Sequence, residues 1–584
     1  MSILHRFTGR ARRVGLPAVL LGLLAACQDT PVTPELPLPD ATLAITSSTA
    51  TCQGITASDS SLVVGDSARL STTVSVRRRN GRYVAETLIW SSSDPSTVSI
   101  SGAFAKARRA GRSLLVATSS NCSGTIPFTV TDPVPTGDTT TPPPPPPPPP
   151  PTTAQKQLAL VLRVFDATQS SPLSSNGIPL PKGWLFERDL PSTILHDGTR
   201  EVARVLLPLA GRYADGSLRS VLLQYQANPA TPRLTLFVGV THGVADPARW
   251  PIPSGTPAAI TQPADLTFLL SSLPGGAIPA AGSPFPTYES QFVTYSDRHF
   301  ATEGVQWEQA NYYDRAFSHY VYWMRSGVPE YWKRATALAL DYRIKYLEAY
   351  GFNPPPHWML LEGIAWHYWL TGDEASRQAV IRTAQQLVFL YPAAQLANPA
   401  GEYIEGRIQA RLLLGTLLGL WVGDNTRDWG SLATQYARAI QATQRSDGSF
   451  SWPNWCGFQG NYMVGLQNDA LIKYYEGFVP DTSLISTIRR SVDYLRRTAW
   501  SSSQQAFGYM TGVCPNVGDP TPAVDLNMLM VAGPAFLGAR TGQRQYLAFA
   551  DSIADGAIRG AWLDGSKQFN QQYYDSYLWL WYRR

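Results

Sequence analysis

Residues 359–370 read MLLEGIAWHYWL, and residues 374–391, one short turn later, read EASRQAVIRTAQQLVFLY. The first segment is apolar almost all round a helix, whereas the second has a face rich in Arg and Gln. A helix that is hydrophobic on every side is enclosed by other helices, and a helix with a polar face is half exposed. The pair therefore predicts an inner helix followed by an outer helix.

The same alternation continues to the C-terminus. Segments 412–421 and 528–537 repeat the apolar type, and segments 428–445 and 484–497 repeat the amphipathic type. Strict alternation predicts an inner ring of helices wrapped by an outer ring. We therefore expect an α/α toroid of about 11–12 helices over residues 291–584.

Loop length predicts which end of this ring is open. Short turns containing Gly follow the apolar segments, whereas long connections precede most of them. Long loops in a compact domain tend to be functional, and the N-terminal ends of helices carry partial positive charge. We expect a mouth at the N-terminal ends of the inner helices. The long connections are 351–356, 392–403, 447–460 and 501–522.

Aromatic, amide and charged side chains gather at those helix ends. Aromatic rings offer flat apolar faces to pyranose rings, and Arg, Asn and Gln bind carboxylates and hydroxyls in fixed geometry. A polysaccharide is therefore the expected partner. The candidates for substrate binding are Asn311, Tyr312, Trp358, Glu362, Arg411, Trp455, Gln459, Asn461 and Tyr573. The candidates for catalysis are His357, Glu405, Arg407, Tyr462 and Asp525.

Two chemistries fit these candidates. A lyase that cleaves by β-elimination needs a group that neutralises the uronate carboxylate and a base for the α-proton, which Arg407 with His357 or Tyr462 supplies. A glycoside hydrolase needs two carboxylates, about 5–5.5 Å apart for retention or about 6.5–9.5 Å apart for inversion. The available carboxylates are Glu362, Glu405 and Asp525.

Structural explanations stand beside the functional ones. An ion pair between Arg411 and Glu362 accounts for two charges on otherwise apolar helices. His367 and His319 are expected to be buried core histidines whose ring nitrogens are hydrogen-bonded within the protein. A non-catalytic glycan-binding or adhesion protein with a degenerate ring is a third alternative, besides lyase and hydrolase.

The N-terminus has the features of a bacterial secretory signal. Residues 1–26 combine a basic start with an apolar stretch too short to span a membrane. The sequence Leu24-Ala25-Ala26-Cys27 resembles the lipobox of bacterial lipoproteins. That resemblance implies lipid attachment at Cys27, a membrane anchor and a place in the cell envelope, at the outer membrane or cell surface. A cleaved signal with a chance cysteine is the alternative.

Net charge and cysteine content limit the possible partners and the cellular compartment. Removing the signal lowers the formal net charge from +5 to about +1, so nothing favours nucleic acid as a partner. Cys52 with Cys122, and Cys456 with Cys514, are the preferred disulfide pairs for an oxidising compartment. No spacing suggests a metal site, although calcium could bridge a uronate to carboxylates. We expect no cofactor and a monomer.

Residues 27–155 predict a tether, an all-β domain and a stiff linker. Residues 27–40 are rich in Pro and Thr, and residues 41–132 alternate β-branched runs with turns. Within them, 62–66 (LVVGD), 89–95 (IWSSSDP) and 110–116 (AGRSLLV) resemble the bacterial Ig-like module of the BIG2 type, which implies a spacer or adhesion role. The linker, 133–155, holds ten consecutive prolines and favours polyproline II.

Residues 156–290 predict a second β-sandwich. The segments 176–183 (NGIPLPKG) and 213–219 (YADGSLR) resemble the N-terminal sandwich of the exo-rhamnogalacturonan lyase (PcRGLX/YetA-like) family, with Tyr213 where that family has Trp. In that family a sandwich precedes an α/α toroid, and the resemblance favours a lyase. It identifies no catalytic residue one by one.

Overall fold

The computed structural model describes residues 50–132, 155–240, 257–270, 284–396, 404–452, 456–512 and 518–583, with short gaps in the first two ranges. The signal sequence, Cys27, the tether and the proline run lie outside these residues, so the anchor and the linker stay predictions. The chain divides into two compact units, and the boundary between them in the sequence falls between Pro148 and Pro149.

The first unit is all-β in the described residues, as predicted. Its longest strands, β10 and β11, pair antiparallel, with Leu115 opposite Ile126. A second sheet has the order β2-β4-β9-β8, and the side chains of Leu70, Val98 and Phe128 are buried in a common core. The strands are β1 (Ala50–Thr51), β2 (Ile55–Ala57), β3 (Ser61–Val63), β4 (Ser67–Thr72), β5 (Ser75–Arg77), β6 (Tyr83–Ala85), β7 (Ile89–Ser92), β8 (Val98–Ser101), β9 (Phe104–Ala107), β10 (Gly111–Thr118) and β11 (Cys122–Thr131).

The second unit begins with one seven-stranded sheet among the described strands, in the order β14-β17-β12-β18-β13-β16-β15. Alternate residues such as Leu160, Leu223 and Leu236 are fully buried in a single core beneath it. The predicted sandwich is therefore one continuous sheet in its hydrogen bonding. Its strands are β12 (Lys156–Val164), β13 (Leu173–Pro179), β14 (Thr193–His196), β15 (Val205–Pro208), β16 (Ser220–Gln226), β17 (Arg233–Val238) and β18 (Ala259–Pro263).

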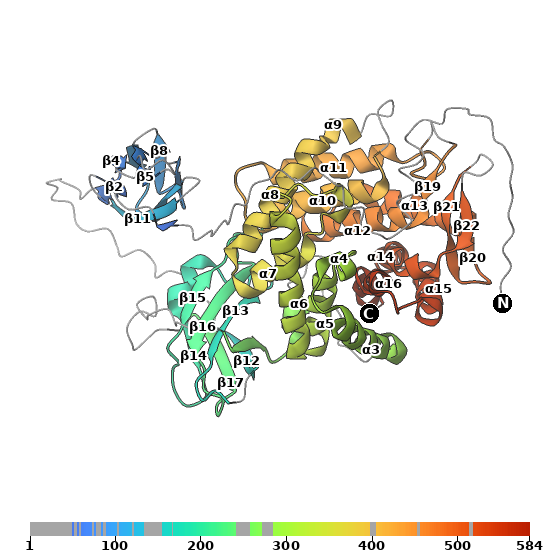
Figure 1. Cartoon of the computed structure of the whole chain (residues 1–584), viewed down its shortest axis with the longest axis horizontal. Helices are drawn as coiled ribbons and strands as arrows, with labels where there is room; N and C mark the ends of the chain where they lie inside the picture. Colours follow the sequence, from blue (N-terminus) through green and yellow to red (C-terminus); the bar gives the residue numbers. More distant parts are fainter. Residues whose placement is uncertain are drawn as a thin grey trace, which may run out of the picture. The chain divides into compact units, whose positions relative to one another are not determined.

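The remainder of the second unit is helical (Figure 1), and buried helices alternate with half-buried ones. The buried set is α5 (Arg315–Ser326), α7 (Glu362–Thr371), α10 (Gly406–Trp421), α12 (Asn461–Gly477), α14 (Ala532–Thr541) and α16 (Ser566–Tyr573) with α17 (Ser576–Tyr582). The outer set is α3 (Pro286–Glu303), α6 (Pro329–Tyr342), α8 (Glu374–Leu390), α11 (Trp429–Thr443), α13 (Ser483–Thr498) and α15 (Arg544–Gly560). The described helices thus confirm the predicted alternation.

The inner helices close into a ring. Helix α5 contacts α7, and the short helix η4 (Pro356–Trp358) ahead of α7 contacts α10. Helix α10 contacts α12, α12 contacts α14, and α14 contacts α17. Helix α16 returns to α5, which closes the circle. We call this arrangement the helical ring, and it is the arrangement expected of an α/α toroid.

The sheet covers the C-terminal ends of three inner helices. The hydroxyl of Ser220 in β16 donates to the carbonyl of Trp369 in α7 at 2.7 Å. The amide of Ala210 donates to the hydroxyl of Tyr368 at 2.5 Å. Trp323 in α5 donates to Gln262 in β18 at 3.1 Å. This side of the ring is therefore occupied, which leaves the N-terminal ends of the inner helices for the mouth.

Residues 213–219, which carried the family resemblance, form part of this contact. Asp215 accepts hydrogen bonds from the amide and the hydroxyl of Ser217. The Arg219 guanidinium lies 4.1 Å from the centre of the Tyr213 ring and 5.5 Å from that of Trp421, the last residue of α10. Burial lowers the pKa of Arg219 to about 10. The segment therefore holds the sheet against the helical ring and does not reach the mouth.

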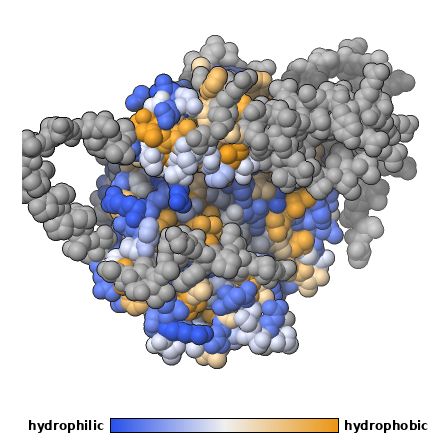
Figure 2. Space-filling view, turned by 90° about the vertical axis from the view of Figure 1, so that its left-hand side faces the viewer, coloured by the Kyte–Doolittle hydropathy of each residue, from blue (hydrophilic) through white to orange (hydrophobic). Residues whose placement is uncertain are grey.

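Short helices and strands also lie on the mouth side of the helical ring. They are α4 (Trp307–Ala310), η3 (Arg343–Glu348), α9 (Ala393–Leu396), β19 (Gln459–Gly460), β20 (Trp500–Ser501), β21 (Ala506–Thr511), β22 (Asp519–Pro522) and η5 (Val524–Leu529). Figure 2 shows a different face, on the left-hand side of Figure 1 where β14, β15 and β16 lie, and this face mixes hydrophilic residues with small hydrophobic patches. Within the described part of the chain, no helix combines the length and the hydrophobicity that a membrane span requires.

Candidate functional site

The turn before α5 has an unusual backbone. Tyr313 and Asp314 adopt φ values of +63° and +50°, although neither is glycine. Such conformations cost of order 1–3 kcal/mol each and persist only where neighbouring contacts enforce them. The turn presents Tyr312, half-buried, at the N-terminal end of α5. Strained turns of this kind cluster at functional sites, so the turn marks Tyr312 as a candidate site residue.

Asp314 supplies the contacts that enforce the turn. One carboxylate oxygen caps α5 by accepting from the amide of Phe317 at 3.0 Å, and the other accepts from the amide of Gly363 in α7 at 2.9 Å. A methyl group on Gly363 would lie 2.3 Å from the first oxygen, so only glycine fits there. Burial raises the pKa of Asp314 to about 6. This residue therefore fixes the starts of two inner helices relative to each other.

Side chains from the starts of α7 and α10 meet around Tyr312, which itself precedes α5. Arg407 donates to the Tyr312 hydroxyl at 2.9 Å and to Glu405 at 2.8 Å. The rings of Trp358 and His357 lie 4.6 Å and 6.5 Å from that of Tyr312, measured between centres. Glu405, Arg407, His357 and Trp358 are all partly exposed.

A tyrosine pair completes the group. Tyr462, in the first turn of α12, stacks on Tyr509 of β21 with 5.6 Å between ring centres and 19° between planes. Arg407 and Tyr312 both lie close enough to Tyr462 to influence its pKa electrostatically. We call the whole set the mouth cluster, which consists of Tyr312, His357, Trp358, Glu405, Arg407, Tyr462 and Tyr509.

Electrostatics give two residues of the mouth cluster different charge states: His357 is neutral and Arg407 is positively charged. Burial, with the positive charges of Arg407 and Arg411, lowers the pKa of His357 to about 4. This imidazole is therefore neutral at pH 7 and able to accept a proton. Burial alone lowers the pKa of Arg407, but Tyr312, Tyr462 and Glu405 outweigh it and raise that pKa. Burial also raises the pKa of Tyr462, which keeps its hydroxyl protonated.

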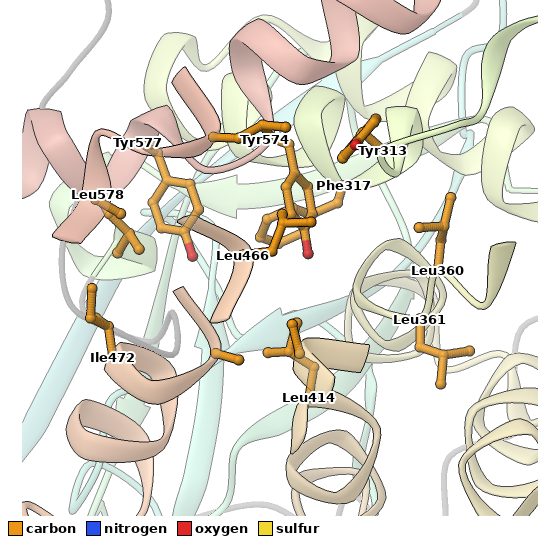
Figure 3. Close-up of a cluster of buried hydrophobic side chains, with 14 of the residues drawn as sticks. Tyr313, Phe317, Leu360, Leu361, Leu414, Leu466, Ile472, Tyr574, Tyr577 and Leu578 are labelled. Atoms are coloured by element: carbon orange, nitrogen blue, oxygen red, sulfur yellow. The ribbon is translucent and has the colours of Figure 1, made fainter. Parts of the chain in front are cut away.

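Deeper in the helical ring lies a buried charge network. The Lys473 ammonium is 2.7 Å from Asp469, 2.8 Å from Glu362 and 3.8 Å from Asp575. The Tyr574 hydroxyl donates to Glu362 and lies 3.4 Å from the Arg411 guanidinium. Figure 3 shows the hydroxyls of Tyr574 and Tyr577 pointing into an interior that Leu414 and Leu466 border.

This network contains more carboxylates than cations. Burial raises the pKa of Asp469 to about 6, and it raises that of Asp575 well above its usual value. Burial would lower the pKa of Lys473, but Asp469 and Glu362 outweigh it and hold the ammonium charged. A buried charge is tolerated only when it is paired and hydrogen-bonded. We therefore assign the network a structural role beneath the mouth cluster.

The structure thus brings together several of the predicted site residues. The catalytic candidates His357, Glu405, Arg407 and Tyr462 meet in one cluster, with the binding candidates Tyr312 and Trp358. Arg411 is buried below them, where its charge still lowers the pKa of His357. Trp455 lies outside the described residues.

Other predicted binding residues lie in the interior. Glu362 is held by Lys473 and Tyr574, so the expected direct pairing with Arg411 is replaced by a tyrosine bridge. Tyr573 donates to the carbonyl of Tyr288 at 2.9 Å within an aromatic core. Asn311 is only 2% exposed. These residues are not retained in the site.

The side-chain amides of Gln459 and Asn461, two of the predicted binding residues, bond to backbone groups beside α12. Asn461 donates to the carbonyl of Gly508 in β21 at 2.8 Å, and Gln459 accepts from the amide of Phe450 at 2.6 Å. Both side chains are almost wholly buried. Their amides satisfy backbone groups and are not retained as sugar ligands.

Asp525 does not join the mouth cluster directly. It accepts from the amide of Trp562 at 2.6 Å. Lys567, in the first turn of α16, lies near Asp525 and has its ammonium 5.7 Å from the centre of the Tyr312 ring. Asp525 therefore occupies the neighbouring edge of the mouth.

Sequence reasoning missed Asp314 and the two partners of Glu362, Lys473 and Tyr574. A signal for the network was present, because Lys473 interrupts the apolar run 471–474 and Asp469 lies one helical turn before it. Cys456 is disulfide-bonded, whereas Cys514 and Cys52 lie outside the described residues, so both pairings stay predictions. Among the described residues, no three His, Cys, Asp or Glu side chains are placed to hold a metal ion.

Comparison with known proteins adds little beyond this geometry. No protein-family model matches the chain, and no curated protein matches it in sequence. An unsaturated glucuronyl hydrolase from Bacillus sp. GL1 is similar at TM-score 0.38 and 12% identity, covering 50% of this chain and 96% of that one. A D-mannose isomerase gives 0.38 and 12%, with 52% and 97% covered. A cellobiose 2-epimerase from Bacillus thermoamylovorans gives 0.33 and 9%, with 45% and 85% covered. Likeness at these scores assigns no activity to this chain.

Proposed function

We propose that the helical ring binds a uronate-containing glycan at its mouth and cleaves it by β-elimination. The observation that carries this proposal is that Arg407 donates to the Tyr312 hydroxyl at 2.9 Å while the ring of the neutral His357 lies 6.5 Å, between centres, from that of Tyr312. Those are the three groups that the reaction requires: a base, a carboxylate ligand and an acid.

Each residue has a defined part in the reaction. Arg407 binds the uronate carboxylate and withdraws negative charge as the neighbouring carbon is deprotonated. His357 removes that α-proton, because its low pKa leaves the imidazole unprotonated. Tyr312 accepts a hydrogen bond from Arg407, so its own proton is available for the departing glycosidic oxygen. Trp358 and Tyr509 offer aromatic faces to the sugar rings.

Hydrolysis is the alternative, and the contacts of the carboxylates favour it less. Glu362 is buried against Lys473, Glu405 is bonded to Arg407, and Asp525 accepts an amide hydrogen. A hydrolase needs two carboxylates that face the glycosidic bond. Of these three carboxylates only Glu405 belongs to the mouth cluster, so the described residues do not place a second one opposite it.

The expected export signal places this reaction in the bacterial cell envelope. Acylation of Cys27 would anchor the chain, and the first unit with the proline-rich linker would hold the helical ring away from the membrane. We propose that the protein acts there as a monomer on polysaccharide.

The test is to incubate the protein with pectins, alginates and glycosaminoglycans. We expect near-ultraviolet absorbance from unsaturated uronate products with at least one of them, and loss of this signal in His357→Gln. New reducing ends without that absorbance would select hydrolysis. Binding on a glycan array with an unchanged ligand would select a non-catalytic role.

A further inference from the structure

Trp562 stands out on the loop between α15 and α16. It exposes 58% of its surface, more than any other tryptophan that the structure describes. Since the loop leads into the buried helix α16, it lies at the same end of the helical ring as the mouth cluster. An exposed indole costs free energy in water, because its apolar faces lack a partner.

The loop that carries this indole is held in place by three contacts. The Trp562 amide donates to Asp525 at 2.6 Å, and His299 donates to the carbonyl of Leu563 at 2.8 Å. Asp564 forms an ion pair with Arg298, and the Leu563 side chain is buried. The loop is therefore fixed at Trp562 and at the two residues that follow it, which preorganises the exposed ring for binding.

A charged residue connects Trp562 to the mouth cluster. Lys567 follows on the first turn of α16, close to Asp525, and its ammonium approaches the Tyr312 ring at 5.7 Å. The path from Trp562 through Lys567 to Tyr312 thus presents an aromatic face, a cation and a second aromatic face. This sequence of groups matches neighbouring units of an acidic sugar chain.

We propose that Trp562 and Lys567 form an outer subsite that binds a second uronate residue of the same glycan. Trp562 stacks on its pyranose ring, and Lys567 attracts its carboxylate. The subsite rests on the proposed function of the mouth cluster and specifies its substrate as an oligomer. Asp525 is then a positioning residue, which holds the Trp562 backbone and takes no part in the chemistry.

The experiment measures binding of saturated oligogalacturonides and oligomannuronates, from two to six residues, by calorimetry on the inactive His357→Gln protein. On that background Trp562→Ala should weaken binding of the longer oligomers about tenfold, as expected for the loss of one buried apolar face. Disaccharide binding should hardly change, and Trp562→Phe should restore most of the loss. Phe104→Ala, an exposed aromatic in the first unit, is the matched control and should have no effect.

Asp525 provides an independent readout. Asp525→Asn keeps an oxygen that accepts the Trp562 amide, so it should bind long oligomers as the parent does, whereas Asp525→Ala should resemble Trp562→Ala. If Trp562→Ala binds every length as tightly as the parent, the subsite is wrong and the proposed function stands. If the parent binds no uronate oligomer and the active protein cleaves none of the three classes of polysaccharide, both are wrong.

Discussion

Arg407 donates a hydrogen bond of 2.9 Å to the hydroxyl of Tyr312, which lies 95 positions earlier in the chain. The bond joins the start of α10 to the turn that precedes α5. It couples the expected carboxylate ligand to the expected acid, so a change in either residue should alter catalysis as well as stability.

Arg407→Ala should lower kcat/KM on the responsive glycan by at least about a hundredfold, as loss of one charge-stabilising donor does in other enzymes. Arg407→Lys should rescue little, because lysine lacks the planar fork that binds a carboxylate. The free energy of unfolding should fall by about 1–3 kcal/mol, since Glu405 and the Tyr312 hydroxyl both lose a largely buried partner. A lyase rate that survives in Arg407→Ala would remove this residue from the mechanism.

The low pKa of His357 leads us to expect an unusual pH dependence of kcat/KM. Its imidazole is active when neutral, and a pKa of about 4 keeps it neutral well below pH 6.5. The acidic limb of kcat/KM should therefore fall near pH 4. Because this pKa is lower in the folded chain than in the unfolded one, the contribution of His357 to stability is present above pH 6.5 and is lost toward pH 4. NMR titration, with His357→Gln for assignment, measures the pKa, and a value near 6.5 would contradict the prediction.

Lys473 predicts a large effect on stability. Lys473→Met leaves Glu362, Asp469 and Asp575 without their shared cation and should cost about 3–5 kcal/mol in the free energy of unfolding. Lys333→Met removes a surface pair with Glu330 and should cost less than about 1 kcal/mol. Denaturant titration compares the two. Equal losses would show that the buried network is not what stabilises the centre of the helical ring.

The contact between the sheet and the helical ring depends on Gly177. A methyl group there would lie 1.8 Å from the carbonyl oxygen of Trp369, which is backbone and has little room to move. Gly177→Ala should destabilise the chain by about 1–3 kcal/mol and open the contact to proteases. Gly430→Ala is the control, because its methyl group would meet the edge of the Phe478 ring at 3.0 Å. Unchanged proteolysis in Gly177→Ala would show that the contact adapts.

The arrangement of inner and outer helices could be predicted because burial leaves a periodic trace. In segment 359–370 nearly every position is apolar, and in 374–391 the polar positions recur on one face. Helix starts could also be located, which is why His357, Arg407 and Tyr462 were found. The single continuous sheet was harder to foresee, because β13 and β18 are neighbours in the sheet although four other strands separate them in the sequence.

What each polar side chain does at a helix start could not be predicted. Gln459 and Asn461 look like sugar ligands, yet their bonds go to the backbone of Phe450 and Gly508. Glu362 is expected from its apolar surroundings to pair with Arg411, yet Lys473 reaches it from a helix more than a hundred residues later. Such partners depend on how distant segments pack, and no local pattern encodes them.

The sheet that lies against α5, α7 and α10 has one further consequence. The sheet covers that end and Lys473 with its carboxylates fills the centre, so the described residues close the helical ring on the side of the sheet. A long sugar polymer cannot be threaded through it. Under the proposed function, a glycan would enter by one of its ends or lie across the opening, and its fragments would leave by the same side.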